Sequence, residues 1–190
     1  SGEPCRRMAD GLRETLRTKF WNLQRGLYSE ALVAGRQSTR FSEHANSIAI
    51  AARIATPEQT QAILPKVLQP AADIVPATSL FVYWTFRALC QNGRVDDAVA
   101  MLESRFAHQL AAGNGTLWEE WNLDRTYRNG RPEKTNRADA QGECGIFPMA
   151  LTRWIAGIEP VAPGMREVVV RRTACSLKDI RTVLPSPLGD

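Results

Sequence analysis

The sequence predicts a mainly α-helical fold in which helices pair as hairpins, followed by a short segment of β-strand character. Apolar residues recur with a helical period nearly throughout residues 6–158. Segments that are apolar on almost every face alternate with segments that have a single apolar stripe. After residue 160 the helical period stops and runs of β-branched residues replace it. We therefore expect inner helices enclosed by protein and outer helices that face solvent.

Two inner helices are expected, at residues 43–55 and 80–91, because both segments are apolar nearly all round. Each is followed, after a short turn, by an outer helix, at 57–64 and 94–108. The apolar stripe of the second outer helix has helical spacing and consists of Val95, Ala98, Val99, Leu102 and Phe106. The order inner, outer, inner, outer predicts a series of helical hairpins.

Local sequence features place the ends of these helices. The run Thr56-Pro57-Glu58-Gln59 offers an N-cap hydroxyl, a proline in the first turn and a capping-box glutamine. Gly93 is expected to end the second inner helix. A last helix is expected at about 145–157, before Pro160 and the turn Pro163-Gly164.

Two β-prone segments follow, at 168–170 and 180–184. Two strands do not make a sandwich by themselves. We therefore interpret 161–190 as the beginning of a β-domain, or as a small ribbon that packs on the helices. This divides the chain into a helical domain, 1–160, and the start of a β-domain, 161–190.

The composition is that of a soluble globular protein, since 44% of the 190 residues are hydrophobic and 23% are charged. No apolar stretch approaches the roughly 20 residues that span a bilayer, so no membrane insertion is expected. The net charge is +4, but lysine and arginine are scattered among acidic residues. A nucleic-acid partner is therefore not expected, because such proteins concentrate basic residues on one face. The compartment cannot be assigned.

Metal and thiol chemistry is not expected either. Four widely spaced cysteines form no C-x-x-C pair, and we interpret them as buried or free thiols. The two histidines, His44 and His108, are 64 positions apart and have no matched ligand cluster. No cofactor is implied. Cys144, between Gly142 and Gly145, has no histidine placed as a base, which argues against a thiol nucleophile.

The chemistry is expected in the long segment 110–143, because a connection of that length in a compact domain is usually functional. It contains the string Trp118-Glu119-Glu120-Trp121. Cleaving a glycosidic bond takes two carboxyl groups, and indole faces pack on sugar rings. Two interpretations stay open at this point: a sugar site, or two core tryptophans with solvated glutamates.

Four segments, in the right order, resemble the bacterial α-L-rhamnosidases with a six-hairpin helical barrel. They are Ser42–Ala49; Ala88–Ala98, with its Gly93 turn; Gly113–Trp121, similar to the family's Gly-Ala-Thr-Thr-x-Trp-Glu motif; and Arg153–Pro160 with Pro163-Gly164. The resemblance implies about three hairpins of an (α/α)6 toroid, followed by the start of a C-terminal β-sandwich. Members of this family are often secreted or periplasmic.

The resemblance implies inverting hydrolysis of terminal α-L-rhamnosyl or related linkages, with a rhamnose-containing carbohydrate as partner. Glu119 takes the place of the general base. Trp118 and Trp121 would form part of the sugar-binding wall, and Glu120 would stand behind Glu119. His44, at the start of an inner helix, is a further candidate for a sugar contact, with a core or pocket-rim position as its other interpretation.

The sequence departs from the family pattern at two points. Where the family usually has a histidine before the final helix, this chain has Gln141, which bonds a hydroxyl but carries no proton. The substrate can therefore differ from rhamnose, and Asp139 and Glu143 become extra candidates for sugar contacts. The second departure concerns the family's general acid, for which 1–190 shows no counterpart. A fragment of a catalytic domain and a short relative both fit, and the chain alone is expected to be inactive.

A different class of function also fits. Helical hairpins of unequal character occur in solenoids, so the chain could be a non-catalytic sugar-binding or protein-binding module. No fixed repeat period is present, and the segment 110–143 would be unusual in a repeat array. Whether Trp118, Glu119 and Trp121 line a concave pocket separates the two hypotheses.

Overall fold

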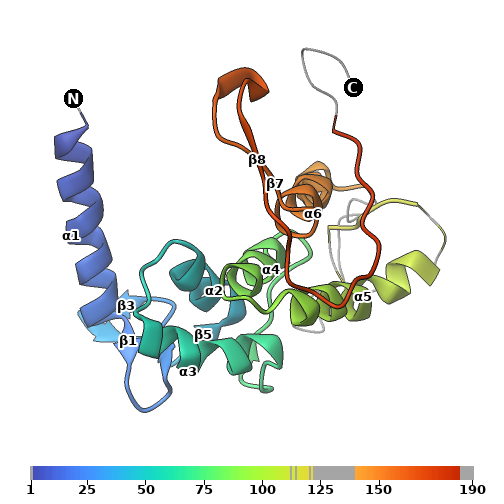
Figure 1. Cartoon of the computed structure of the whole chain (residues 1–190). Coiled ribbons are helices and arrows are strands. Elements are labelled where there is room, and N and C mark those ends of the chain that lie inside the picture. Colours follow the sequence, from blue (N-terminus) through green and yellow to red (C-terminus); the bar gives the residue numbers. More distant parts are fainter. Residues whose placement is uncertain (1, 112, 114, 120, 122–139, 185–190) are drawn as a thin grey trace. The chain divides into compact units, whose positions relative to one another are not determined.

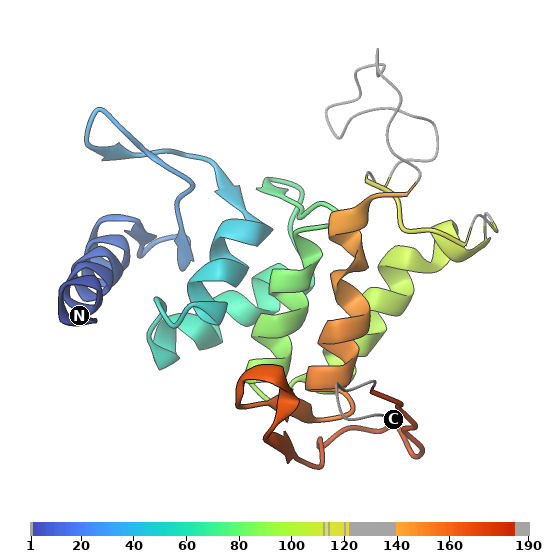
Figure 2. The same ribbon diagram turned by 90° about the horizontal axis from the view of Figure 1, so that it is seen from above.

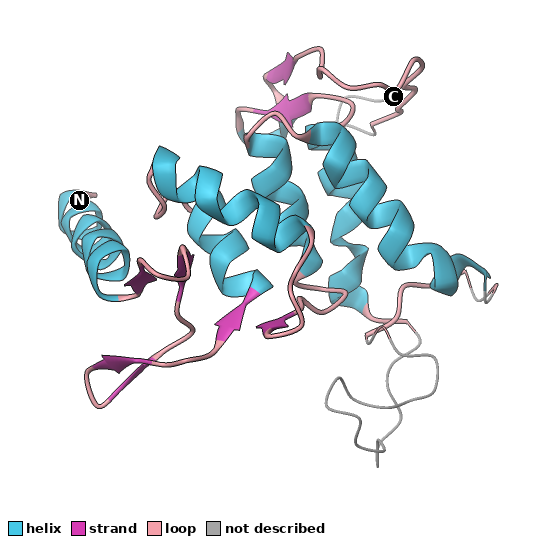
Figure 3. Cartoon of the chain, turned by 90° about the horizontal axis from the view of Figure 1, so that it is seen from below, coloured by secondary structure: helices cyan, strands magenta, loops and turns pink. Residues whose placement is uncertain are grey.

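The computed structural model describes residues 2–111, 113, 115–119, 121 and 140–184. The chain divides into two compact units, Ser1–Ala77 and Thr78–Asp190. Helices dominate both units, and the strands are only two or three residues long (Figure 3).

The first unit has three helices and six short strands, labelled in part in Figure 1. In chain order they are α1 (Glu3–Lys19), β1 (Trp21–Asn22), β2 (Leu27–Tyr28), β3 (Leu32–Val33), β4 (Arg36–Gln37), β5 (Phe41–Ser42), α2 (Glu43–Ala51), α3 (Pro57–Leu68) and β6 (Ile74–Val75). β1–β2 and β3–β4 are antiparallel hairpins, whereas β5 and β6 pair in parallel.

The expectation of helical periodicity through residues 20–42 is wrong, because this segment forms the two hairpins. The turn between β3 and β4 consists of Ala34 and Gly35, which both have positive φ values, 50° and 77°. Two-residue turns of this kind match the twist of antiparallel strands. Gly26, with φ 58°, ends the loop of the other hairpin. In this segment the turn residues determine a hairpin structure, although the apolar pattern indicates a helix.

α2 begins where the sequence predicts an inner helix. The Ser42 side chain caps it by accepting a hydrogen bond from the Ala45 N–H. Six of its nine residues are buried, so the helix is enclosed on most faces. It ends at Ala51, four residues before the expected end.

α3 packs against α2 and completes the first hairpin. The Thr56 hydroxyl accepts from the Gln59 N–H while the Gln59 side chain accepts from the Thr56 N–H, which confirms the predicted capping box. Four of its twelve residues are buried, as expected of an outer helix. The helix continues through Pro65 to Leu68, beyond the expected end at residue 64.

The second unit contains α4 (Val82–Gln91), α5 (Val95–Ala111), the 3₁₀ helix η1 (Gly142–Ile146), α6 (Phe147–Trp154), β7 (Ile158–Pro160), the 3₁₀ helix η2 (Pro163–Met165) and β8 (Val168–Val170). α4 packs against both α5 and α6, and the three helices lie side by side in Figure 2. The core of the unit is therefore built around α4.

α4 has the character predicted for an inner helix. Seven of its ten residues are buried, whereas α5 buries five of the residues described among its seventeen. Phe86 is fully buried and Trp84 is half-buried, while Phe81, just before the helix, is 37% exposed. Gly93, with φ 73°, turns the chain between α4 and α5. The contrast between inner and outer helices is thus confirmed.

A small antiparallel ribbon of β7 and β8 follows α6. Gly157 precedes it with φ 73°, and a Cβ atom there would collide with the carbonyl oxygen of Arg171. The strand expected at 168–170 is confirmed, but the strand expected at 180–184 is wrong, because those residues are mostly exposed and pair with no strand among the described residues. The ribbon crosses the domain boundary expected at residue 160, which stays a prediction.

The predicted fold class is confirmed: a partial set of helical hairpins is followed by a small β region. In the described part of the chain no helix is both long and apolar enough to cross a membrane. The four thiols are free, and those of Cys90 and Cys144 are buried.

Candidate functional site

The Trp-Glu-Glu-Trp segment lies in the second unit, between α5 and η1. Trp118, Glu119 and Trp121 are described by the structure. Glu120 and Asp139, both candidates for the sugar site, lie outside the described residues, so their assignments stay predictions.

Trp118 is a buried anchor of this segment. It is 1% exposed, and its ring lies edge-on to the His108 imidazole with centroids 6.1 Å apart. Its backbone N–H donates to the Gln109 Oε1 atom at 3.1 Å. The indole faces are therefore covered in this structure, and the expected contact of Trp118 with sugar stays a prediction.

Trp121 is half-buried and packs on α5. Its ring lies 4.9 Å from that of Phe106 and 6.2 Å from that of His108. Its carbonyl oxygen lies 2.6 Å from the His108 Nε2 atom, a contact that needs a proton on that nitrogen. Trp121 keeps some exposed indole surface, which a sugar ring could cover.

The backbone of Trp118 and Glu119 is held by Ser79 and Cys144. The Ser79 hydroxyl lies 2.6 Å from the carbonyl oxygens of both Trp118 and Glu119. The Cys144 thiol donates to the Ser79 Oγ atom at 3.4 Å and lies 3.5 Å from the Trp118 carbonyl oxygen. Ser79 and Cys144 are fully buried. The segment is thus fixed to the residues that precede α4 and to η1.

The side chain of Glu119 lies at the surface, although its backbone is anchored in the interior. Burial raises the pKa of the Cys144 thiol, and the negative charges of Glu143 and Glu119 raise that pKa further, against the opposing effect of the Ser79 hydrogen bond. The Glu143 and Glu119 charges thus both disfavour the thiolate of Cys144, and Glu119 is accessible to water.

Gln141 lies next to the Trp-Glu-Glu-Trp segment, where it contacts Leu117. Its backbone N–H donates to the Leu117 carbonyl oxygen at 2.9 Å. A shallow depression of about 230 Å³ lies there, lined by Thr116, Leu117, Ala140, Gln141, Gly142 and Gly145. The structure thus brings Gln141 beside the Trp-Glu-Glu-Trp segment, but Trp118, Glu119 and Trp121 do not line this depression. The expected contact of Gln141 with a sugar hydroxyl stays a prediction.

His44 belongs to the first unit. Its side chain is 31% exposed, and its Nε2 atom lies 3.8 Å from the Glu30 Oε1 atom. Its neighbour Glu43 is fully buried and accepts a hydrogen bond from the Ala77 N–H at 2.9 Å. The assignment of His44 to a sugar contact stays a prediction.

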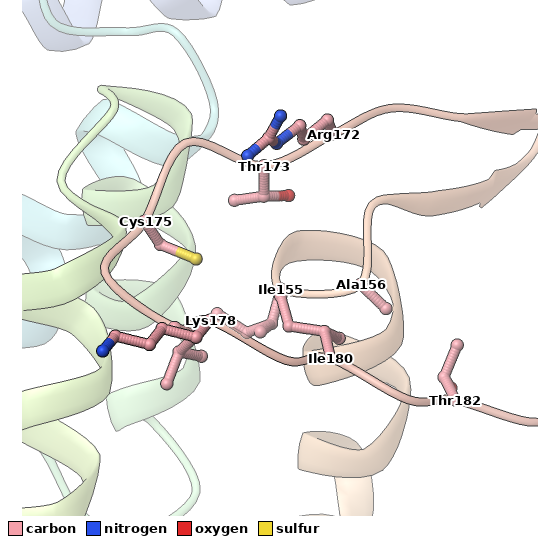
Figure 4. A pocket seen from close by; sticks show the side chains of 9 residues that line it. Ile155, Ala156, Arg172, Thr173, Cys175, Lys178, Ile180 and Thr182 are labelled. Atoms are coloured by element: carbon pink, nitrogen blue, oxygen red, sulfur yellow. The ribbon is translucent and has the colours of Figure 1, made fainter.

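A second hollow, of about 240 Å³, lies beyond the end of α6, and Figure 4 shows side chains that line it. Ile155, Ile180 and the half-buried Cys175 form part of its wall, whereas the Lys178 ammonium group points away from it. Among the residues that the structure describes, no group of three or more His, Cys, Asp or Glu side chains could hold a metal ion.

Comparison with solved structures gives two informative neighbours. The GH78 family rhamnosidase of Bacillus sp. GL1 aligns with a TM-score of 0.78 and 22% identity, over 95% of this chain and 19% of that one. The rhamnosidase from Klebsiella oxytoca with rhamnose bound aligns with a TM-score of 0.57 and 20% identity, over 78% of this chain and 28% of that one. This chain has a rhamnosidase-like fold. It spans less than a third of the length of either neighbour.

No protein-family model matches the sequence, and no curated protein matches it significantly. At identities of 20–22% the two rhamnosidases show the fold alone. The rhamnosidase-like fold agrees with the resemblance of the four sequence segments. The roles of individual residues are a separate question.

Sequence reasoning missed the residues that hold the segment in place. Ser79, Gln109 and His108 act through hydrogen bonds to the backbone of residues 118–121. Such bonds have no sequence motif, because any polar side chain at the right place can form them. The one available indication was positional, since Ser79 directly precedes the predicted inner helix, His108 ends the predicted outer helix and Gln109 follows it.

Proposed function

We propose that this chain supplies one side of the active site of an inverting glycoside hydrolase, with Glu119 as the general base. The substrate class is a terminal α-L-rhamnosyl linkage or a related one. One observation supports this proposal above all. In a rhamnosidase-like fold, the exposed residue Glu119 has a backbone carbonyl that is hydrogen-bonded to the buried Ser79 side chain.

The chemistry requires such a carboxylate. In an inverting mechanism a base removes a proton from water, which attacks the anomeric carbon from the face opposite the leaving group. The base must reach water and must be held in place, because a misplacement of about 1 Å can cost roughly 10²-fold in rate. Glu119 combines a solvent-accessible side chain with an anchored backbone.

The surrounding residues would bind the sugar. The half-exposed ring of Trp121 offers apolar surface, and Gln141 and Asp139 would bond hydroxyl groups. Trp118 would support this wall from the interior, and Glu120 would stand behind the base. His44 is proposed as a further sugar contact.

The general acid is placed outside residues 1–190, because the resemblance finds no counterpart of it in this sequence. An inverting site needs two carboxyl groups roughly 6.5–9.5 Å apart. Without leaving-group protonation the reaction loses about 10²–10⁴-fold in rate. We therefore expect binding without enzymatic turnover by this chain alone.

The test assays residues 1–190 on a panel of aryl glycosides and, where the natural protein extends beyond these residues, compares them with that longer protein. The longer protein should release the aglycone from an aryl α-L-rhamnoside, and proton NMR should show β-L-rhamnose as the first sugar formed. The chain alone should show no turnover. Equal turnover by the chain alone would place the acid within it, with Glu43, Asp139 and Glu143 the first to replace. Binding of sugar without hydrolysis by either form would favour the non-catalytic module.

A further inference from the structure

The geometry points to Ser79 as a positioning residue that sets the direction of the Glu119 side chain. Its hydroxyl oxygen lies 2.6 Å from the carbonyl oxygen of Trp118 and 2.6 Å from that of Glu119. The first carbonyl belongs to the peptide plane before the Glu119 Cα atom, and the second belongs to the plane after it. Because these two rigid planes fix the direction of the Cα–Cβ bond, one buried hydroxyl sets the direction in which the Glu119 side chain leaves the backbone.

Cys144 completes this arrangement. Ser79 has a single hydroxyl proton, which it shares between the two carbonyl oxygens, and its oxygen accepts from the Cys144 thiol at 3.4 Å. Burial raises the pKa of this thiol, so it keeps its proton at neutral pH and serves as the donor. Because the thiol donates to the Ser79 oxygen, the Ser79 hydroxyl proton points to the carbonyl oxygens of Trp118 and Glu119.

Two residues at the end of α5 hold the opposite side of the segment. The Gln109 side chain accepts the Trp118 N–H at 3.1 Å, and His108 contacts the Trp121 carbonyl oxygen at 2.6 Å. The backbone of Trp118 is therefore held at its N–H by Gln109 of α5 and at its carbonyl oxygen by Ser79. Removing the Ser79 hydroxyl releases one side, and it leaves the buried Trp118 carbonyl and the partly buried Glu119 carbonyl without this donor.

This inference rests on the proposed role of Glu119 as base. A base that points in the wrong direction slows the chemical step but leaves sugar binding nearly unchanged. We expect Ser79→Ala to lower kcat by about 10–100-fold, within the range for a 1 Å misplacement, with KM changed less than about twofold. A purely structural role would lower the amount of folded protein and leave kcat per folded molecule intact.

The experiment measures kcat and KM of the longer protein with an aryl α-L-rhamnoside, normalised to folded enzyme, for wild type and five variants. Ser79→Ala and Glu119→Gln are the test pair. Cys144→Ser retains a donor and should keep kcat within about threefold, whereas Cys144→Ala should lose more. Cys90→Ala removes a similarly buried thiol from α4 and should leave kcat unchanged.

A second measurement uses residues 1–190 and follows amide hydrogen exchange by NMR. Exchange of the Trp118 N–H should accelerate at least tenfold in Ser79→Ala and stay at the wild-type rate in Cys90→Ala. If Glu119→Gln abolishes turnover while Ser79→Ala keeps kcat, the positioning inference is overturned and the proposed function survives. If Glu119→Gln keeps kcat, the proposed function fails, and unchanged Trp118 exchange in Ser79→Ala would then refute the positioning as well.

Discussion

The side chain of Asn46 forms hydrogen bonds with both backbone polar groups of Tyr28. Its Oδ1 atom accepts the Tyr28 N–H at 2.7 Å, and its Nδ2 atom donates to the Tyr28 carbonyl at 3.1 Å and to the Ser42 carbonyl at 2.9 Å. Asn46 is fully buried on α2, and Tyr28 ends the β1–β2 hairpin. One amide therefore joins the helix to the hairpin, and it satisfies the backbone groups that the hairpin leaves unpaired in the core.

Asn46→Ala should lower the free energy of unfolding of the first unit by about 2–3 kcal/mol, because it leaves buried backbone groups of Tyr28 unsatisfied. Urea unfolding monitored by circular dichroism measures this change. Asn92→Ala, which loses one partly buried bond to the Ala88 carbonyl, should cost about 0.5–1 kcal/mol. An equal loss of unfolding free energy in the two variants would show that the bonds of Asn46 stabilise the protein no more than the single bond of Asn92 does.

The stability of the protein should fall as pH rises from 9 towards 12. Burial raises the pKa of the Cys90 thiol from 9.0 to about 12, so the unfolded chain loses this proton at lower pH than the folded chain does. Below pH 9 the neutral thiol makes its full contribution to the free energy of unfolding. This contribution falls as the pH rises towards 12, and about 1 kcal/mol of it is lost at pH 10.

Cys90→Ala should therefore make the alkaline loss of stability shallower, whereas replacement of the exposed Cys5 should leave it unchanged. Thermal unfolding at pH 8, 9 and 10 measures this. Burial also raises the pKa of Tyr28 to about 12, an effect that the positive charge of Arg17 opposes, so a residual decline above pH 10 is expected in every variant. Identical pH profiles for wild type and Cys90→Ala would contradict the assignment.

Asp96 fastens the segment after β8 to the start of α5. Its Oδ1 atom accepts from the Ser176 N–H at 2.7 Å and from the Ser176 hydroxyl at 2.9 Å. Both residues are exposed, so Asp96→Ala should change the free energy of unfolding by less than about 1 kcal/mol. Trypsin cleavage at Arg172 and Lys178 should nevertheless become several times faster. Asp97→Ala is the matched control, and equal cleavage rates in the two variants would rule out this fastening.

The helical hairpins could be predicted from the sequence because their evidence is local. The apolar pattern of 80–91 indicates an inner helix, and Thr56 with Gln59 marks the start of α3 by a cap that needs only four residues. Gly93 ends its hairpin turn with a positive φ, as glycine commonly does. These features depend on neighbours within one or two helical turns.

The failures have physical reasons as well. The hairpins of residues 20–42 depend on a turn in which Ala34, a residue that rarely adopts positive φ, does so beside Gly35. Residues 180–184 are rich in β-branched side chains but pair with no strand in the described part of the chain. The anchors of the Glu119 backbone, Ser79 and Cys144, are brought together only by the tertiary fold.

The most direct test of the account is the turnover number of the Glu119→Gln variant of the longer protein on an aryl α-L-rhamnoside. Glutamine preserves the shape and the backbone anchors but cannot accept a proton from water. We expect kcat to fall by about 10²–10⁴-fold while the unfolding temperature and the affinity for L-rhamnose stay near those of wild type. A Glu119→Gln protein that retains more than half of the wild-type kcat would contradict the assignment of Glu119 as the general base.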